Sequence, residues 1–189
     1  MKPENMSSCS GPNGEPQRQE LAGGDSRERP AMAGGAVISP DGRYRYRLWR
    51  DWANTGRVTF VMLNPSTADG TEDDPTIRKC IGFAQRLGCG GFDVVNLFGL
   101  RSRNPRALQL AADPVGPGND DHLRQAGGRS SQPIIVAWGA YGAYYPQRIA
   151  AVMGLLSRAV RCLSVTKEGQ PGHPLMLSYK CLPQPWEIR

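Results

Sequence analysis

Unbroken apolar runs that stop at turn residues dominate the pattern of hydrophobic and polar positions. The run at 58–63 ends at Asn64-Pro65-Ser66, and the run at 133–138 ends at Gly139. Short runs of this kind, bounded by turn residues, are typical of strands that are buried on both faces of a sheet. The pattern predicts core strands at 57–63, 92–97, 133–138 and 160–165.

Segments with helical spacing lie between these strands. Asp74 suits a helix N-cap and Pro75 the first helical position, and apolar side chains then recur at helical spacing until Gly88. Further helices are expected at 105–108, from Asn119 and near 145–156. Strands that alternate with helices argue for a parallel sheet that is covered on both faces.

Arginine alternates with tyrosine or leucine at 43–49, which is typical of a half-exposed antiparallel strand. The turn residues Asn54-Thr55-Gly56 follow, so we expect this strand to form a hairpin with the strand at 57–63. The predicted fold is α/β, a three-layer α/β/α sandwich. Its central sheet has four mainly parallel strands plus this N-terminal antiparallel strand.

Composition divides the chain into a tail and one domain. Residues 1–36 are rich in Gly, Pro, Ser, Glu and Arg and nearly lack large aliphatic side chains, so we expect them to be disordered. Residues 37–189 are expected to form a single domain with a substantial core. The sequence opens without the apolar core of a signal peptide, and no stretch approaches the roughly 18 apolar residues of a membrane span. We expect a soluble, cytoplasmic, monomeric protein.

The cysteines and histidines argue against two kinds of stabilising site. Five cysteines include no Cys-x-x-Cys pair, and two histidines accompany them. An odd number of cysteines does not support a disulfide framework, and so few histidines do not support a zinc site. We expect reduced thiols, no metal and no cofactor.

A net charge of +6 and a pI near 9.3 favour a polyanionic partner. The basic residues that flank the predicted strand ends are Arg43, Arg45, Arg47, Arg50, Arg101, Arg103 and Arg106, with Lys167 and Lys180 further on. We interpret them as one rim that faces phosphates, with ordinary solvated surface charge as the alternative.

Three polar residues lie where such a sheet binds ligands. Asn64 follows the first core strand, Asn96 lies at the end of the second, and His173 stands in Gly172-His173-Pro174-Leu175. Ligands of open α/β folds bind outside the carboxyl ends of the strands. Each residue also has a plainer interpretation: Asn64 in a simple turn, Asn96 as a buried amide that ties loops together, and His173 on the surface.

Several motifs together resemble a known family. They are Met62-Leu63-Asn64-Pro65-Ser66-Thr67-Ala68-Asp69, Asp74-Pro75-Thr76, Val95-Asn96-Leu97-Phe98 and Ala137-Trp138-Gly139. They look like the bacterial and phage family called domain of unknown function 1643, from about Tyr44 to Pro174. That name implies no activity. The order of the motifs also resembles the uracil-DNA glycosylase superfamily, which implies double-stranded DNA as the partner.

The second resemblance implies a role for each candidate residue. Asn64 would position the hydrolytic water, Asn96 would read the edge of a flipped base, and His173 would donate to the oxygen of the leaving base. Asp69 would help Asn64 to orient the water. The substrate site would also include Pro65, Ser66 and Phe98. The DNA contacts would be Arg101, Arg103, Lys167 and Lys180. The wedge candidates would be Leu175, Met176 and Leu177.

Departures from the superfamily pattern point to an unusual base. Met62 replaces a glycine, Leu175 replaces a serine, and no aromatic residue follows Asn64-Pro65 to exclude large bases. We therefore expect a bulky substrate, such as a hydroxymethylated or glycosylated pyrimidine of the phage type, whose removal leaves an abasic site. A role in defence against phages is the corresponding hypothesis.

Other classes of protein stay open. One is a hydrolase or transferase of free nucleosides or nucleotides, and another is a non-catalytic nucleic-acid-binding module. The acidic residues Asp69, Glu72, Asp73 and Asp74 raise a Mg²⁺-dependent nuclease. Against this, Asp74 suits the helix cap, Asp73 lies favourably at the positive end of the helix, and no second carboxylate set completes a two-metal site.

Overall fold

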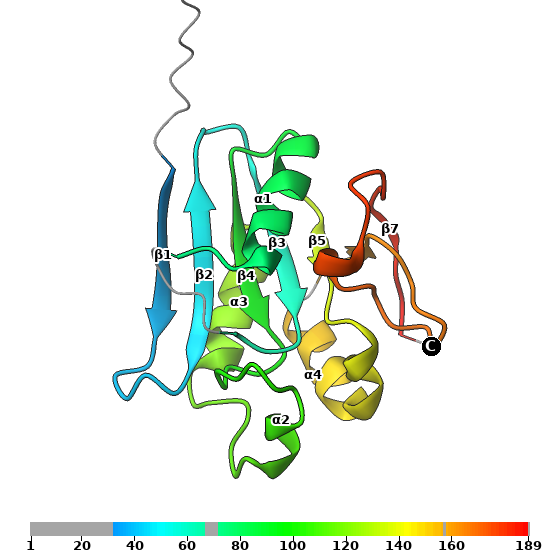
Figure 1. Cartoon of the computed structure of the whole chain (residues 1–189). Coiled ribbons are helices and arrows are strands. Elements are labelled where there is room, and N and C mark those ends of the chain that lie inside the picture. The colour runs from blue at the N-terminus through cyan, green and yellow to red at the C-terminus, as the bar shows by residue number, and fades with distance from the viewer. Residues whose placement is uncertain (1–31, 67–71, 157, 189) are drawn as a thin grey trace, which may run out of the picture.

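Backbone pairing joins seven strands into one sheet in the order β1-β2-β4-β3-β5-β6-β7 (Figure 1). The computed structural model describes residues 32–66, 72–156 and 158–188. The strands are β1 (Ala33–Ile38), β2 (Arg45–Asp51), β3 (Arg57–Met62), β4 (Gly91–Asn96), β5 (Ile134–Val136), β6 (Val160–Cys162) and β7 (Gln184–Pro185).

The four strands β4, β3, β5 and β6 run parallel, whereas β1, β2 and β7 pair antiparallel at the two sides. β4 is buried at every position, and β3 at every position except Arg57. Unbroken apolar runs therefore do mark strands that are covered on both faces. β5 and β6 are three residues long, shorter than the runs that contain them.

The hairpin predicted between 43–49 and 57–63 is wrong. β2 pairs with β4, with Leu48 opposite Val94, and β3 lies on the other side of β4, with Val61 opposite Val95. The more apolar β3 lies between β4 and β5, where both faces are covered, and the half-polar β2 lies further out. Alternation and a turn signal identify a strand but not its partner.

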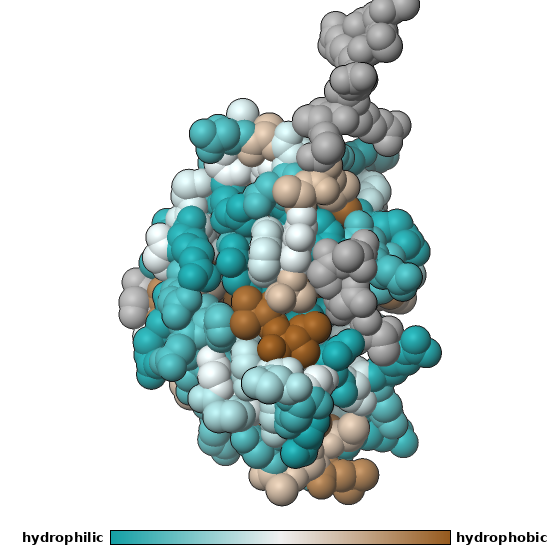
Figure 2. Space-filling model, turned by 90° about the vertical axis from the view of Figure 1, so that its left-hand side faces the viewer, coloured by the Kyte–Doolittle hydropathy of each residue, from teal (hydrophilic) through white to brown (hydrophobic). Residues whose placement is uncertain are grey.

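The sheet is also larger than the predicted four strands plus one. β1 begins at Ala33, so residues 33–36 belong to the sheet rather than to a disordered tail. These alanines and glycines contribute little apolar surface, and backbone pairing with β2 holds them, which a composition argument does not detect. Figure 2 shows the β1 side of the molecule, which is mostly hydrophilic around one compact apolar group.

Helices cover both faces of the sheet. They are α1 (Pro75–Arg86), α2 (Ala107–Leu110), α3 (Asn119–Arg129) and α4 (Pro146–Leu156), with short 3-10 helices η1 (Ala140–Tyr144) and η2 (Pro174–Met176). On one face Phe60 packs with Phe83 of α1, and on the other Val61 packs with Leu123 of α3 and Ile149 of α4. Within the three described ranges, no helix is long and apolar enough to cross a membrane.

The start of α1 follows its prediction. The Oδ1 atom of Asp74 accepts a hydrogen bond from the backbone N–H of Ile77 at 2.8 Å, and Pro75 takes the first helical position. Gly88, with a φ of 73°, follows the last turn. The Asp74 Oδ2 atom also accepts from Ser66 at 3.2 Å, so this end of α1 lies beside the carboxyl end of β3.

A close backbone approach makes Gly90 a test of this packing. A Cβ at Gly90 would lie 2.0 Å from the carbonyl oxygen of Ala53, whereas a Cβ at the exposed Gly128 of α3 would meet nothing within 4 Å. We expect Gly90→Ala to lower the free energy of unfolding by about 1–3 kcal/mol. Gly128→Ala should raise it by about 0.5–1 kcal/mol, because alanine favours helix. Urea unfolding measures both, and equal stabilities would contradict the expectation.

Candidate functional site

The carboxyl ends of three parallel strands meet at one edge of the sheet. Pairing continues past β3 and β4, because the N–H of Leu97 donates to the carbonyl of Met62 at 2.8 Å. Gly139, just after β5, lies so close to the C-terminal segment that a Cβ there would be 3.2 Å from the Cβ of His173. The structure therefore brings three residues predicted from the sequence to this edge: Asn64, Asn96 and His173.

Asn64 ties two loops together through its amide nitrogen. Nδ2 donates to the carbonyl oxygens of Pro65 at 3.1 Å, Leu100 at 3.4 Å and Ser102 at 2.9 Å. These acceptors determine the orientation of the carboxamide, because only its nitrogen can donate. Its Oδ1 atom accepts no hydrogen bond from the part of the chain that the structure describes, so it is available to a water or a ligand.

Asn96 is buried without hydrogen bonds. The residue is 1% exposed, and neither Nδ2 nor Oδ1 has a partner among the described residues. Alternation along β4 directs its side chain to the α1 face, the face of Val94. An unpaired buried polar group costs about 1–3 kcal/mol, and such groups are rare in native proteins. The amide that ties loops together is therefore Asn64, whereas the carboxamide of Asn96 is buried without a partner among the described residues.

Two side chains from the helical layer of α3 and α4, on the other face of the sheet from α1, hold the end of β4. The Nδ2 of Asn119 donates to the carbonyls of Asn96 at 3.0 Å and Leu97 at 3.2 Å, and the Nε of Arg148 donates to Leu97 at 2.7 Å. Asn119 does not cap α3, because Gly118 takes the N-cap position. The sequence predicted only a helix cap at Asn119. An asparagine suits both a cap and a hydrogen bond to a strand, so the residue type does not distinguish the two roles.

His173 is half-buried and presents one ring nitrogen to the site. Its Nδ1 accepts a hydrogen bond from the backbone N–H of Leu175 at 3.4 Å. In the neutral ring the proton is therefore on Nε2, which becomes the donor. Burial lowers the pKa of His173 below its usual value, and the negative charge of Asp74 opposes this shift.

Asp74 is more than a helix cap. Its two carboxylate oxygens accept from Ile77 and from the hydroxyl of Ser66, and its charge acts on His173. Ser66, Asp74 and His173 thus form a polar group beside the start of α1. Asp74 lies near Ser66 and His173 only because the folded chain brings their segments together, so no local sequence pattern predicts this arrangement.

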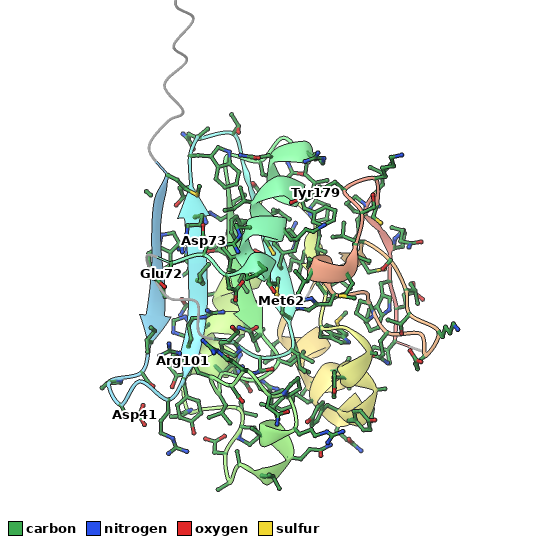
Figure 3. All side chains as sticks on the ribbon, viewed as in Figure 1. Asp41, Met62, Glu72, Asp73, Arg101 and Tyr179 are labelled. Atoms are coloured by element: carbon green, nitrogen blue, oxygen red, sulfur yellow. The ribbon has the colours of Figure 1, made fainter. Side chains whose placement is uncertain are left out.

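The segment that carries His173 is fixed to α1. The Nζ of Lys79 donates to the carbonyl of Leu177 at 2.7 Å, and Tyr179 lies beneath Lys79 at 4.4 Å and Arg86 at 4.2 Å from its ring centre (Figure 3). Leu177 is partly buried against the core of this face. Leu177 therefore packs against this core, and its predicted role as a DNA wedge stays a prediction.

Two of the residues expected at the substrate have structural roles. Phe98 is 4% exposed and packs edge-on against Tyr145, with ring centres 4.7 Å apart, on the α3 and α4 face. Pro65 is buried, and its carbonyl accepts from the N–H of Ser102 at 2.9 Å. Phe98 belongs to the same core cluster as Val95 and Leu97, on the face of the sheet away from α1.

The basic residues of β2 do not form an exposed rim. Arg45 and Arg50 are each 3% exposed, and Arg50 pairs with Asp73 at 2.7 Å (Figure 3 labels Asp73). Arg47 pairs with the buried Asp93 at 2.7 Å. The segment before α1 covers one face of β2 and α3 covers the other, so these guanidinium groups are enclosed and paired.

The remaining predicted DNA contacts divide by exposure. Arg101 is half-buried and donates to the carbonyl of Gly42 at 3.1 Å (Figure 3). Leu175 is 41% exposed. Among the basic residues predicted to face phosphates, the exposed ones are Arg43, Arg103, Arg106, Lys167 and Lys180.

The described ranges contain no group of three or more histidine, cysteine or acidic residues that could hold a metal ion. Asp69, the predicted partner of Asn64, lies outside the described residues, as does all of 67–71.

Comparison with known families matches residues 45–175 to the family described as "Protein of unknown function (DUF1643)". The matched range contains Asn64, Asp74, Asn96 and His173. No curated protein and no solved structure matches the chain.

The link between Asp74 and His173 can be measured directly. The chain has two histidines, and burial lowers the pKa of both His122 and His173, but Asp74 acts on His173 alone. Asp74→Asn keeps a capping residue, so we expect it to lower the pKa of His173 further and to leave that of His122 unchanged. An NMR titration of the two imidazoles measures both, and an unchanged pKa of His173 would refute the electrostatic effect of Asp74.

Proposed function

The chain belongs to the DUF1643 family, and from the geometry of its site we propose that it is a monofunctional DNA glycosylase. It hydrolyses the N-glycosidic bond of a modified base in double-stranded DNA and leaves an abasic site. The protein acts without a metal and as a monomer. The order of polar strand ends that resembles the uracil-DNA glycosylase superfamily supports this proposal.

The carboxamide of Asn96 carries the proposal. It is buried at the carboxyl end of β4 and has no partner among the residues described, so one donor and one acceptor lie side by side without hydrogen bonds. A base edge presents the complementary pair of groups once the nucleotide is flipped out of the duplex. A bound base would satisfy the carboxamide and recover the free energy that its burial costs.

His173 and Asn64 supply the chemical step. As the N-glycosidic bond breaks, its electron pair moves to the base, and the Nε2–H of His173 donates to the oxygen that gains negative charge. The oxygen of a water then forms a bond to the anomeric carbon of the sugar, and the water loses its proton to the departing base or to solvent. The Oδ1 of Asn64 orients that water by accepting a hydrogen bond from it.

Ser66 shapes the preference for a large base. It stands directly after Asn64-Pro65, where its hydroxyl donates to Asp74 at 3.2 Å. The serine side chain is much smaller than the aromatic ring that would exclude large bases in this position. A pyrimidine with a hydroxymethyl or glycosyl group is the substrate that this arrangement favours.

Alkali-revealed abasic sites test the proposal. The protein is incubated in EDTA with duplexes and phage genomes that carry uracil, hydroxymethylated, glycosylated or unmodified bases. We expect strand breaks with one class of modified base. Asn96→Ala and His173→Ala should each lower the rate by about 100-fold or more. Asn54→Ala, an exposed amide at the opposite edge of the sheet, should leave the rate unchanged.

Other outcomes would replace the proposal with one of its alternatives. Covalent trapping on DNA by borohydride would exclude a monofunctional enzyme. Salt-sensitive DNA binding without any breaks would identify a binding module, and turnover of free nucleotides without DNA would identify a nucleotide hydrolase.

A defensive role predicts a difference between phages. Cells that express the protein should plate phages with the modified base poorly and phages with unmodified DNA normally, since only the former carry the substrate. Asn96→Ala should restore plating. Equal plating of both kinds of phage on wild-type cells would argue against this role.

A further inference from the structure

A concave surface opens near the carboxyl end of β5. It is a hollow of about 370 Å³, and it is lined by Tyr141 and Tyr144 of η1, Arg106 and Gln109 next to and within α2, and Glu168 after β6. η1 follows β5, whose carboxyl end also adjoins the segment of His173. None of the residues that line this hollow takes part in the proposed excision.

The two tyrosines offer an exposed aromatic surface. Tyr144 is 66% exposed and Tyr141 is 43% exposed, and their ring centres are 6.1 Å apart at an angle of 43°. Tyr141 therefore supports one side of Tyr144, and the remaining ring surface is open to solvent. Exposed aromatic rings of this kind stack on nucleobases.

Buried hydrogen bonds hold the walls of the hollow in place. The Nε1 of Trp138 donates to the Oε1 of Gln170 at 2.9 Å, and the Nε1 of Trp186 donates to the carbonyl of Gly169 at 3.2 Å. A Cβ at Gly142 of η1 would lie 2.2 Å from the Trp138 ring, so η1 packs directly on it. η1 and the turn at 166–170 are thus joined before any ligand arrives, which lowers the cost of binding.

The polar groups of the hollow define its ligand. Arg106 is exposed and suits a phosphate. Glu168 suits an amino group instead, as carboxylates accept from the N4 amino group of cytosine. The hydroxyl of Thr166 bonds to Glu168 and lowers the pKa of its carboxyl, so the group is ionised at neutral pH. Gln109 can donate and accept at the same base edge.

We propose that this hollow binds one unpaired nucleobase that carries an exocyclic amino group, in the strand that enters the proposed excision site. Tyr144 stacks on the base, Glu168 accepts from its amino group, and Arg106 contacts the adjacent phosphate. The choice of DNA as the strand rests on the proposed glycosylase function. Binding itself requires no excision and can be measured separately.

Fluorescence anisotropy with two labelled single-stranded oligonucleotides, oligo-dC and oligo-dT of about eight nucleotides, tests the proposal. The intact protein should bind oligo-dC more tightly than oligo-dT, because thymine lacks an amino group. Tyr144→Ala should weaken binding of both about fivefold or more, and Tyr144→Phe should retain it. Glu168→Gln should reduce the preference for oligo-dC.

Leu110→Ala is the matched control, because Leu110 is 88% exposed beside Gln109 but does not line the hollow. It should bind both oligonucleotides as the intact protein does, and thermal unfolding checks that every variant is folded. Unchanged binding by Tyr144→Ala, or equal binding of oligo-dC and oligo-dT by the intact protein, would overturn the proposal. If the protein excises a base but Tyr144→Ala binds the oligonucleotides as the intact protein does, only the proposal for the hollow is overturned. If the oligonucleotides bind as expected but no base is excised, only the glycosylase function is overturned.

Discussion

The parallel pairing of β3 with β4 is the constraint on which the arrangement of the site depends. Met62 lies opposite Asn96 in the register, and the pairing continues through Leu97. Apolar residues on both faces of these strands set this register, since a slip of one residue would exchange the two faces. Asn96 would then enter the core beneath α3 and α4, and Val95 would take its place. The apolar core thus determines where the polar groups stand.

Support for this strand end comes from both helical layers. On one side Asn119 and Arg148 hold the backbone carbonyls of the strand end, and on the other Lys79 and Tyr179 fix the segment of His173 to α1. A site built on rigid elements keeps its groups in place before a ligand binds. The carboxamide of Asn96 is one of several buried polar groups that lack a partner among the described residues, and Thr59 and Asn119 each carry another such atom.

The proposed excision site and the tyrosine-lined hollow share the carboxyl end of β5 as a common support. Gly139 lies against the segment of His173, and Trp138 supports η1 from the core. The two surfaces differ in kind, because one has a buried amide and a half-buried imidazole whereas the other has exposed aromatic rings.

Local patterns in the sequence determined the apolar strands, the capped start of α1 at Asp74 and the placement of Asn64 and Asn96 at strand ends. These features depend on residues that are close along the chain, so a single sequence contains them. Only the tertiary structure decided that β2 pairs with β4, that Arg50 is buried against Asp73, and that Phe98 faces the core. It also decided that Asp74 acts on the pKa of His173 and that Tyr144 and Glu168 line one hollow. Each of these contacts joins segments that are distant in sequence, and their meeting depends on which strands and helices lie side by side.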